Sequence, residues 1–252
     1  MGQSRSPLDV AGLELVAAGG WPGWDTGRLG DWLLRAGGGF TGRANSALVV
    51  GDPGCALPEA VDAVTHWYTE RDLRPTVQLP GVQARAAGTA FGAAGWERDE
   101  DVLVLTAPLP LGADGGRIAV DLFPAPDDAW LAGYRHRGSA LPPAARRVLT
   151  GAEDVVFASV RLEPAPAPLA AVGRGVLTDG WLGVSAVTVD EAHRRQGLAT
   201  ELTTALYRWG ADRGARWAYL QVSSSNAAAR ALYARAGFVE HHRYHYRRAP
   251  LR

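Results

Sequence analysis

The feature that most constrains the fold of this chain is a strand, a basic loop and a helix in direct succession. Residues 181–189 are rich in β-branched side chains and lie between turn-forming residues, which predicts a strand. From Leu198, apolar residues recur every three to four positions as far as Trp209, and Gly214 is placed to end a helix. The loop between them therefore leads directly into a helix N-terminus.

This loop has the composition of an anion site. The first four N–H groups of a helix lack partners, and the helix dipole favours negative charge at that end. Gly197 and Ala199 leave the backbone open to close approach, while Arg194 and Arg195 add charge and donors. Neither a Walker motif nor a Gly-x-Gly-x-x-Gly fingerprint is present. The alternative for the two arginines is an ordinary solvated loop.

A second group of residues follows in a defined order. Residues 217–222 predict another strand, followed by Asn226 and a short alanine-rich helix that a Gly-Phe pair closes. That helix carries Tyr233. Taken singly, Asn226 is explained as a helix N-cap and Tyr233 as a half-buried aromatic residue. The joint order and spacing give both residues more weight than either has alone.

These motifs together resemble those of the GCN5-related N-acetyltransferase (GNAT) superfamily. Arg194-x-x-Gly197-x-Ala199 is similar to the loop signature of that superfamily, and Asn226 and Tyr233 occupy the polar positions of its later motif. The resemblance covers about residues 118–250. It implies an α/β fold with a mixed sheet flanked by helices, a splayed central strand pair, and acetyl-CoA as co-substrate.

The resemblance also implies a set of site residues. Unpaired amides on the family's splayed fourth strand would bind the acyl carbonyl and pantetheine, the loop amides would bind the pyrophosphate, and Tyr233 would protonate the departing thiolate as the catalytic acid. The predicted coenzyme-binding residues are Val187, Thr188, Val189, Arg194, Arg195, Gln196, Gly197, Leu198, Ala199, Thr200, Asn226, Ala229 and Tyr233.

The first half of the chain looks like a degenerate copy of the second. At a spacing of 142 residues, Phe91 aligns with Tyr233 and Trp67 with Trp209. At the same spacing Asn226 aligns with Ala84, so the polar groups assigned to the coenzyme are missing from the first copy. We therefore predict two tandem GNAT-like domains with one coenzyme site, residues 1–115 forming the degenerate domain and residues 116–252 the catalytic domain. Chance alignment of alanine-rich helices is the alternative.

Charge follows the same division. All 26 basic residues are arginine, with 8 before residue 116 against 14 acids and 18 after it against 12 acids. An anionic ligand is therefore drawn to the second half. The arginines are scattered, which makes nucleic acid an improbable partner. The single cysteine, Cys55, permits no intrachain disulfide or thiolate cluster, and no metal is predicted.

A further segment, residues 39–46, suggests an acceptor site. Arg43 and Asn45 could face a cleft and hold a substrate carboxylate, since arginine is a two-pronged donor. The alternative is that both hold their own loop together. The motifs leave the amine acceptor, the acyl preference and the general base open, with Asp190, Glu240 and His241 among the candidate bases.

These observations predict an acetyl-CoA-dependent N-acetyltransferase in which an amine attacks directly in a ternary complex. The competing classes are an acyl-CoA-binding module without catalysis and a scaffold with the same fold. No signal peptide or membrane-length apolar segment is seen, so we expect a cytoplasmic monomer or homodimer whose partners are acetyl-CoA and an amine.

Overall fold

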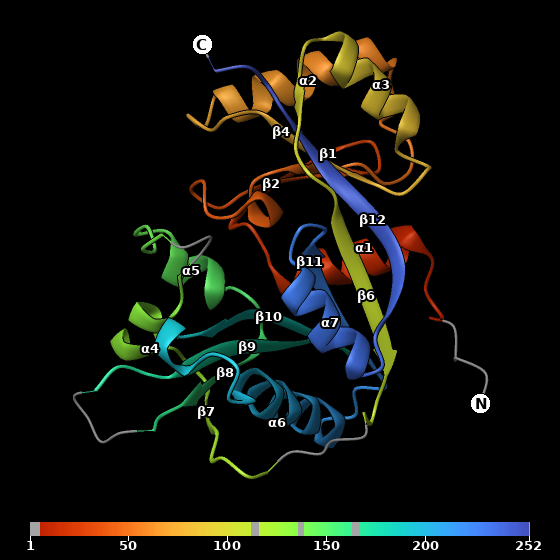
Figure 1. Ribbon diagram of the computed structural model, residues 1–252. Helices are drawn as coiled ribbons and strands as arrows, with labels where there is room; N and C mark the ends of the chain where they lie inside the picture. Colours follow the sequence, from red (N-terminus) through yellow and green to blue (C-terminus); the bar gives the residue numbers. More distant parts are fainter. Residues whose placement is uncertain (1–5, 112–115, 136–138, 163–166, 252) are drawn as a thin grey trace.

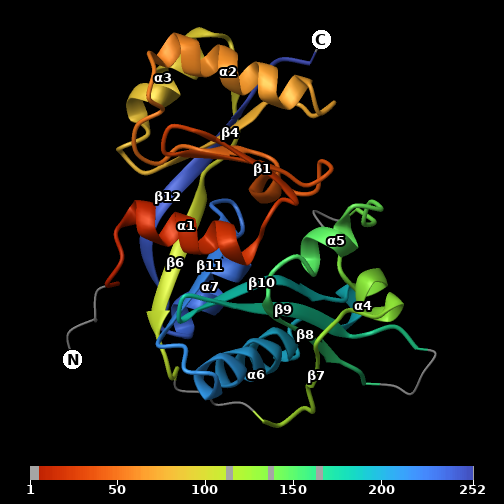
Figure 2. The same ribbon diagram turned by 180° about the vertical axis from the view of Figure 1, so that it is seen from behind.

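The computed structural model describes residues 6–111, 116–135, 139–162 and 167–251. Its strands form one mixed sheet in the order β1-β2-β3-β4-β12-β6-β11-β10-β9-β8-β7, with β5 pairing beside β12. Figures 1 and 2 show the two halves of the chain at opposite ends of this sheet, with β6 and β12 running between them. Within the described ranges, no helix combines the length and apolar character needed to cross a bilayer.

The first half contributes three α-helices and six strands among its described residues. In chain order these are α1 (Val10–Gly20), β1 (Asp25–Leu29), β2 (Trp32–Ala36), β3 (Ala47–Leu48), α2 (Leu57–Thr69), β4 (Thr76–Pro80), α3 (Arg85–Ala93), β5 (Glu97–Arg98) and β6 (Val102–Pro108), with the short 3-10 helix η1 (Gly42–Ala44) before β3.

The second half begins with a strand and two short helices. Its elements are β7 (Asp121–Phe123), α4 (Asp128–Gly133), α5 (Ala145–Leu149), β8 (Asp154–Val160), β9 (Ala171–Thr178), β10 (Trp181–Val189), η2 (Glu191–His193), α6 (Leu198–Asp212), β11 (Trp217–Ser223), α7 (Ala227–Arg235) and β12 (Val239–Arg248). The expected strand at residues 181–189 and the helix that begins at Leu198 are therefore both present.

The internal repeat is visible in the helix boundaries. Helices α3 and α7 begin and end 142 residues apart, at the spacing found in the sequence. The backbone N–H of Trp96 donates to the Phe91 carbonyl at 3.0 Å, and Phe238 donates to Tyr233 at the same distance. Matching hydrogen bonds close both helices, so the repeat is structural as well as sequential.

The two halves exchange strands, which the sequence pattern did not predict. Strand β6 comes from the first half but lies between β11 and β12, antiparallel to both. Strand β12 comes from the second half and pairs antiparallel with β4 of the first. The boundary predicted at residue 115 lies in 112–115, outside the described residues, but the pairing shows that neither half completes its part of the sheet alone.

Strand β10 separates from β11 partway along its length. The two strands pair in parallel from Trp181 to Val184, opposite Trp217 to Leu220. Beyond that point β10 stays beside β9, with a register shift between Ser185 and Thr188 and a positive φ of 56° at Ala186. A bulge of this kind bends a strand and ends pairing on one edge. The predicted splay of the central strand pair is therefore confirmed.

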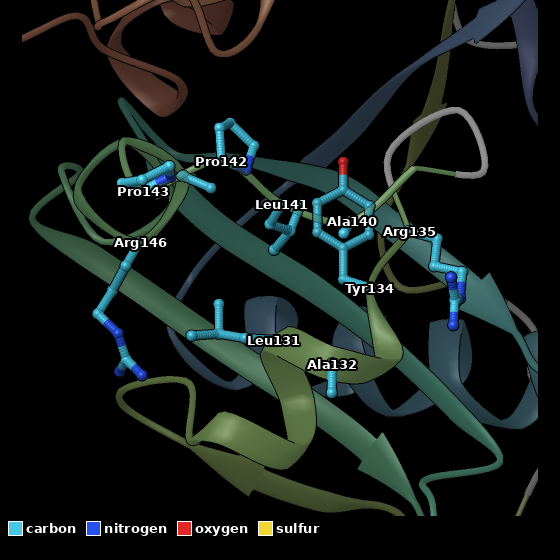
Figure 3. Close-up of a pocket in the computed structure, with 10 residues that line it drawn as sticks. Leu131, Ala132, Tyr134, Arg135, Ala140, Leu141, Pro142, Pro143 and Arg146 are labelled. Carbon is cyan, nitrogen blue, oxygen red and sulfur yellow. The ribbon is translucent and has the colours of Figure 1, made fainter.

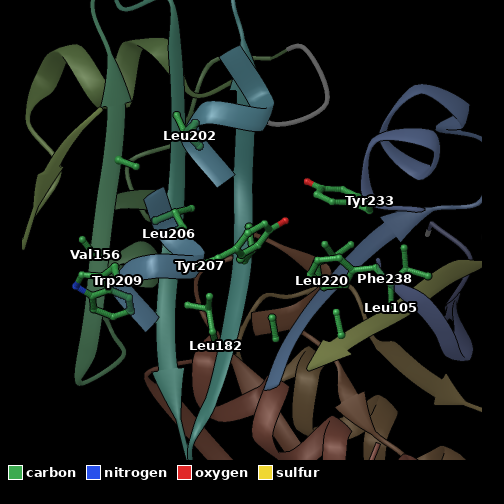
Figure 4. Close-up of a cluster of buried hydrophobic side chains, with 14 of the residues drawn as sticks. Leu105, Val156, Leu182, Leu202, Leu206, Tyr207, Trp209, Leu220, Tyr233 and Phe238 are labelled. Carbon is green, nitrogen blue, oxygen red and sulfur yellow. The ribbon is translucent and has the colours of Figure 1, made fainter. Parts of the chain in front are cut away.

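The largest core cluster fixes the elements around this splay (Figure 4). Leu202 and Leu206 of α6 pack on β9 at Gly173 and Gly175, and an added Cβ on Gly173 would lie 2.3 Å from a Leu202 methyl. The absence of a side chain there lets α6 approach the sheet closely. Tyr233 of α7 belongs to the same cluster, which ties α7 to α6 across the splay.

Candidate active site

The N-terminus of α6 is open toward solvent and has no side-chain cap. Gly197 is the N-cap residue with a φ of 83°, and no side chain bonds the first turn of the helix. A Cβ added at Gly197 would meet nothing within 4 Å. Arg195 also has a positive φ, 63°, so the loop turns sharply twice before the helix begins. Donor groups and space for an anion coincide here.

A cavity of about 680 Å³ extends from this helix end toward the splay. It is lined by β10, the loop before α6, and α7, and it takes in every predicted coenzyme-binding residue except Gln196, which is exposed outside it. The lining includes Ala228, Leu232 and Arg235, which the sequence analysis did not select. Their spacing of four and three residues on one face of α7 could have identified them.

The charge of this cavity is one-sided. Arg194, Arg195 and Arg235 line it, and none of the described residues in its lining is acidic. Arg194 is 3.3 Å from the Glu191 carboxylate, but this pair is largely exposed, and such pairs are weak in water. The arginines therefore remain able to bind an anionic ligand.

Asn226 performs the structural role considered for it and also lines the cavity. Its side-chain oxygen accepts a hydrogen bond from the backbone N–H of Ala229 at 3.0 Å, which caps α7. An amide has two N–H donors besides its oxygen. Capping therefore uses the acceptor and leaves the donors of Asn226 for a ligand.

Tyr233 lies at the inner end of the cavity, where only 7% of the residue is exposed. Figure 4 shows its ring beside Tyr207, and the ring of Phe238 contacts both, with centroids 5.9 Å from Tyr233 and 5.8 Å from Tyr207. Burial raises the pKa of Tyr233 well above its ordinary value, and Tyr207 raises it further. The hydroxyl of Tyr233 is therefore protonated at neutral pH.

An acyl-coenzyme A molecule matches the donor set of this cavity. The uncapped helix N-terminus and the arginines suit its phosphates, and the cradle at Gly197 is one that a side chain would fill. The unpaired segment Val187–Val189 offers backbone groups, while Leu198 and Leu232 add apolar wall. The residues present therefore fit the group that the fold implies.

A second cavity, of about 330 Å³, lies on the other face of β11. Side chains alternate along a strand, so Leu220 and Val222 belong to the core beneath α6 and α7, whereas Gln221 and Ser223 line this second cavity. Arg43 lines it from the first half of the chain. The two cavities therefore approach the freed end of β11 from opposite sides.

Asn45, predicted alongside Arg43, does not line either cavity. Its side-chain oxygen accepts hydrogen bonds from the backbone N–H groups of Gly37 and Gly39, and its amide nitrogen donates to the Thr41 carbonyl. All of these partners are backbone groups of its own loop. The side chain of Asn45 thus fixes the loop that presents Arg43.

A third cavity, of about 540 Å³, lies between α4 and α5 (Figure 3). Leu131, Leu141 and prolines supply most of its wall, and the ring of Tyr134 points away from α4. It lacks the helix N-terminus and splayed strand that mark the first cavity.

The candidate bases named from the sequence are engaged elsewhere. Glu240 makes two hydrogen bonds to Arg243, which hold the pKa of Glu240 below its usual range. Asp190 caps η2, and His241 contacts His242 and the Leu8 carbonyl. Across the described part of the chain, no group of three or more potential metal ligands occurs.

The fold and the site define a GNAT protein: a splayed β10–β11 pair with an uncapped α6 N-terminus beside the splay. Residues 8–247 match the family described as "Probable histone acetyltransferase Rv0428c C-terminal", and the chain belongs to that family. It is an N-acetyltransferase of the GNAT superfamily, as its curated relatives also indicate.

Two curated proteins are similar over nearly the whole chain. The Mycobacterium tuberculosis "Probable histone acetyltransferase Rv0428c" is 34% identical over 94% of this chain and 73% of its own length. The Bacillus subtilis "Uncharacterized N-acetyltransferase YobR" is 26% identical over 95% of this chain and 98% of its own.

Solved structures agree on the fold. A GCN5-related N-acetyltransferase from Kribbella flavida has a TM-score of 0.65 at 18% identity, covering 96% of this chain and 94% of its own. A tandem GNAT protein from the clavulanic acid biosynthesis pathway has a TM-score of 0.60 at 14% identity, covering 100% of this chain and 92% of its own. The tandem architecture predicted from the repeat is thereby supported.

Proposed function

We propose that the protein transfers an acetyl group from acetyl-CoA to a primary amine by direct attack in a ternary complex, using one donor site in the second half. The observation that carries this proposal is the cavity that joins the uncapped N-terminus of α6 to the splay of β10. Its residues bind a phosphate-bearing thioester at one end and place the acyl group at the other.

Each part of the site has a separate task. The amides and arginines around Gly197 hold the donor's phosphates, and Asn226 donates to the pantetheine arm. Unpaired amides of Val187–Val189 face the acyl carbonyl, where negative charge develops as the amine attacks. The carbon–sulfur bond then breaks, Tyr233 gives its proton to the sulfur, and water accepts the proton lost by the amine.

The first half lacks a matching donor site. In α2, the Glu59 carboxylate accepts from the Ala56 N–H at 3.2 Å, so an acid already occupies the helix N-terminus. Ala84 begins α3 without a side-chain cap, and Phe91 has no hydroxyl at the position equivalent to Tyr233. A bound phosphate there would face a carboxylate in place of arginines.

The acceptor enters from the second cavity. It lies across the freed end of β11 from the donor cavity, so an amine placed there can reach the acyl group through the splay. Its volume suits a small molecule better than a folded partner. The name of the mycobacterial relative suggests a histone, and the arginines of this cavity argue against so cationic a substrate.

Calorimetric titration with acetyl-CoA tests the donor site. Wild-type protein is expected to bind one equivalent per chain, and Arg194→Ala/Gly197→Glu is expected to lose binding because it removes a cation and adds a carboxylate at the phosphate position. Two equivalents would contradict the single-site proposal. Binding without free-thiol release for any amine in a broad panel would favour a non-catalytic acyl-CoA module.

A further inference from the structure

Two arginines from different halves of the chain lie over one indole ring. The guanidinium carbon of Arg43 is 3.9 Å from the ring centroid of Trp21, and that of Arg174 is 4.9 Å from the same centroid. Arg43 comes from the loop before β3, and Arg174 from β9 beside the splay. The ring face attracts each cation, but the two cations repel one another.

Arg174 is wholly buried and only partly satisfied. Its Nε donates to the Leu149 carbonyl at 2.8 Å and its Nη1 to the Gly20 carbonyl at 3.0 Å, while Nη2 has no hydrogen-bond partner. Burial lowers the pKa of Arg174 to about 9, with Arg43 lowering it as well, so the group still carries its charge at neutral pH. A buried charge with a spare donor is costly unless an anion compensates it.

The described residues supply no such anion. Neither guanidinium has a carboxylate within 4 Å in the described part of the chain. The nearby buried acid, Glu14, already bonds His242 and Gln78. By contrast Arg71, stacked 3.7 Å from the ring centroid of Trp67, has the Asp25 carboxylate at 2.8 Å.

The pair stands beside the second cavity. Arg43 lines that cavity together with Thr41, whose buried hydroxyl has no hydrogen-bond partner. Gln221 and Ser223 bring the same cavity to the freed end of β11, where the acyl group arrives. A ligand in this position meets an uncompensated cation and a spare hydroxyl while its other end faces the splay.

We propose that the acceptor is an amine that also carries a carboxylate, and that Arg43 and Thr41 bind the carboxylate. Arg174 adds positive potential from behind Trp21. Arginine binds a carboxylate with two parallel hydrogen bonds, which fixes orientation as well as affinity. The proposal rests on the acetyl transfer proposed above and names the chemical class of its acceptor as amino acids or similar small molecules.

Ligand-dependent thermal stability tests the anion site without acetyl-CoA. The probes are N-acetyl amino acids, which have the form of the expected products, and their neutral amides, at constant ionic strength. The carboxylates are expected to raise the Tm of wild-type protein in a saturable way, and the amides are not. Arg43→Gln is expected to weaken that binding on the order of 10- to 100-fold, as the loss of a charged hydrogen bond implies.

Arg71→Gln is the matched control, because it removes an arginine that stacks on a tryptophan but already has a carboxylate partner. It is expected to retain the preference for carboxylates over amides. Equal shifts by carboxylates and amides, or by either set in wild type and Arg43→Gln, would overturn the proposal. A lower Tm for Arg43→Gln with unchanged carboxylate binding would show that the arginine only covers Trp21.

Kinetics then separate this proposal from the donor site. Acetyl-CoA titration of Arg43→Gln is expected to match wild type, since the donor cavity lies on the other face of β11. In thiol-release assays, the KM for amino acids is expected to rise on the order of 10- to 100-fold with little change for their amides. Amides used as well as the parent amino acids by wild-type protein would refute the acceptor class while leaving acetyl transfer intact.

Discussion

Replacing Tyr233 by phenylalanine removes one hydroxyl from the inner end of the donor cavity and keeps the ring. The ring packs on Phe238 within the main core cluster, and no hydrogen bond of its hydroxyl is recorded among the described residues. The free energy of unfolding should therefore change by less than about 1 kcal/mol. If Tyr233 protonates the leaving thiolate, kcat should fall by roughly 10²–10⁴, equivalent to about 3–5 kcal/mol of barrier.

The assay measures free-thiol release at saturating acetyl-CoA, with calorimetry for donor affinity and thermal unfolding for stability. Tyr207→Phe is the matched control, because Tyr207 lies beside Tyr233 but does not line the cavity. It should retain most of the turnover. Unchanged kcat in Tyr233→Phe would refute the acid role, and a joint loss of donor binding and stability would assign the residue to packing.

The pH profile provides a second check on Tyr233. Burial raises the pKa of its phenol above the ordinary value, so the protonated form persists as pH rises through the range where a free tyrosine would begin to ionise. Wild-type kcat should therefore show no decline assignable to Tyr233 up to about pH 9. A basic limb below that pH that disappears in Tyr233→Phe would contradict the raised pKa.

Other substitutions test the local geometry. Asn226→Ala should lower stability by about 1 kcal/mol through loss of the α7 cap and weaken acetyl-CoA binding, whereas Asn226→Ser should keep the cap and lose only binding, as thermal unfolding and calorimetry will show. Gly183→Ala should cost about 1–3 kcal/mol in urea unfolding, because the new Cβ would lie 2.5 Å from the Tyr219 hydroxyl. Glu59→Ala should leave the calorimetric stoichiometry at one, and a second equivalent would show that this carboxylate alone blocks the first half.

Local pattern predicted much of the donor site. The strand at 181–189, the start of α6 at Leu198 and the cap at Asn226 depend on periodicity, helix-end chemistry and turn residues that lie close together in the chain. The repeat spacing placed α3 and α7 in register for the same reason. What escaped was the inner wall of α7, where Leu232 and Arg235 carry no distinctive motif.

The sequence by itself determined the elements, their order, the repeat and the charged loop, because each follows from neighbouring residues. Only the tertiary structure decided that β6 crosses into the second half and β12 reaches β4, since backbone hydrogen bonding between strands is much the same for many sequences. It also decided that Asn45 holds its own loop and that Arg43 meets Arg174 over Trp21. Those contacts join residues far apart in the chain, and burial without a counter-ion is a property of the folded surroundings alone.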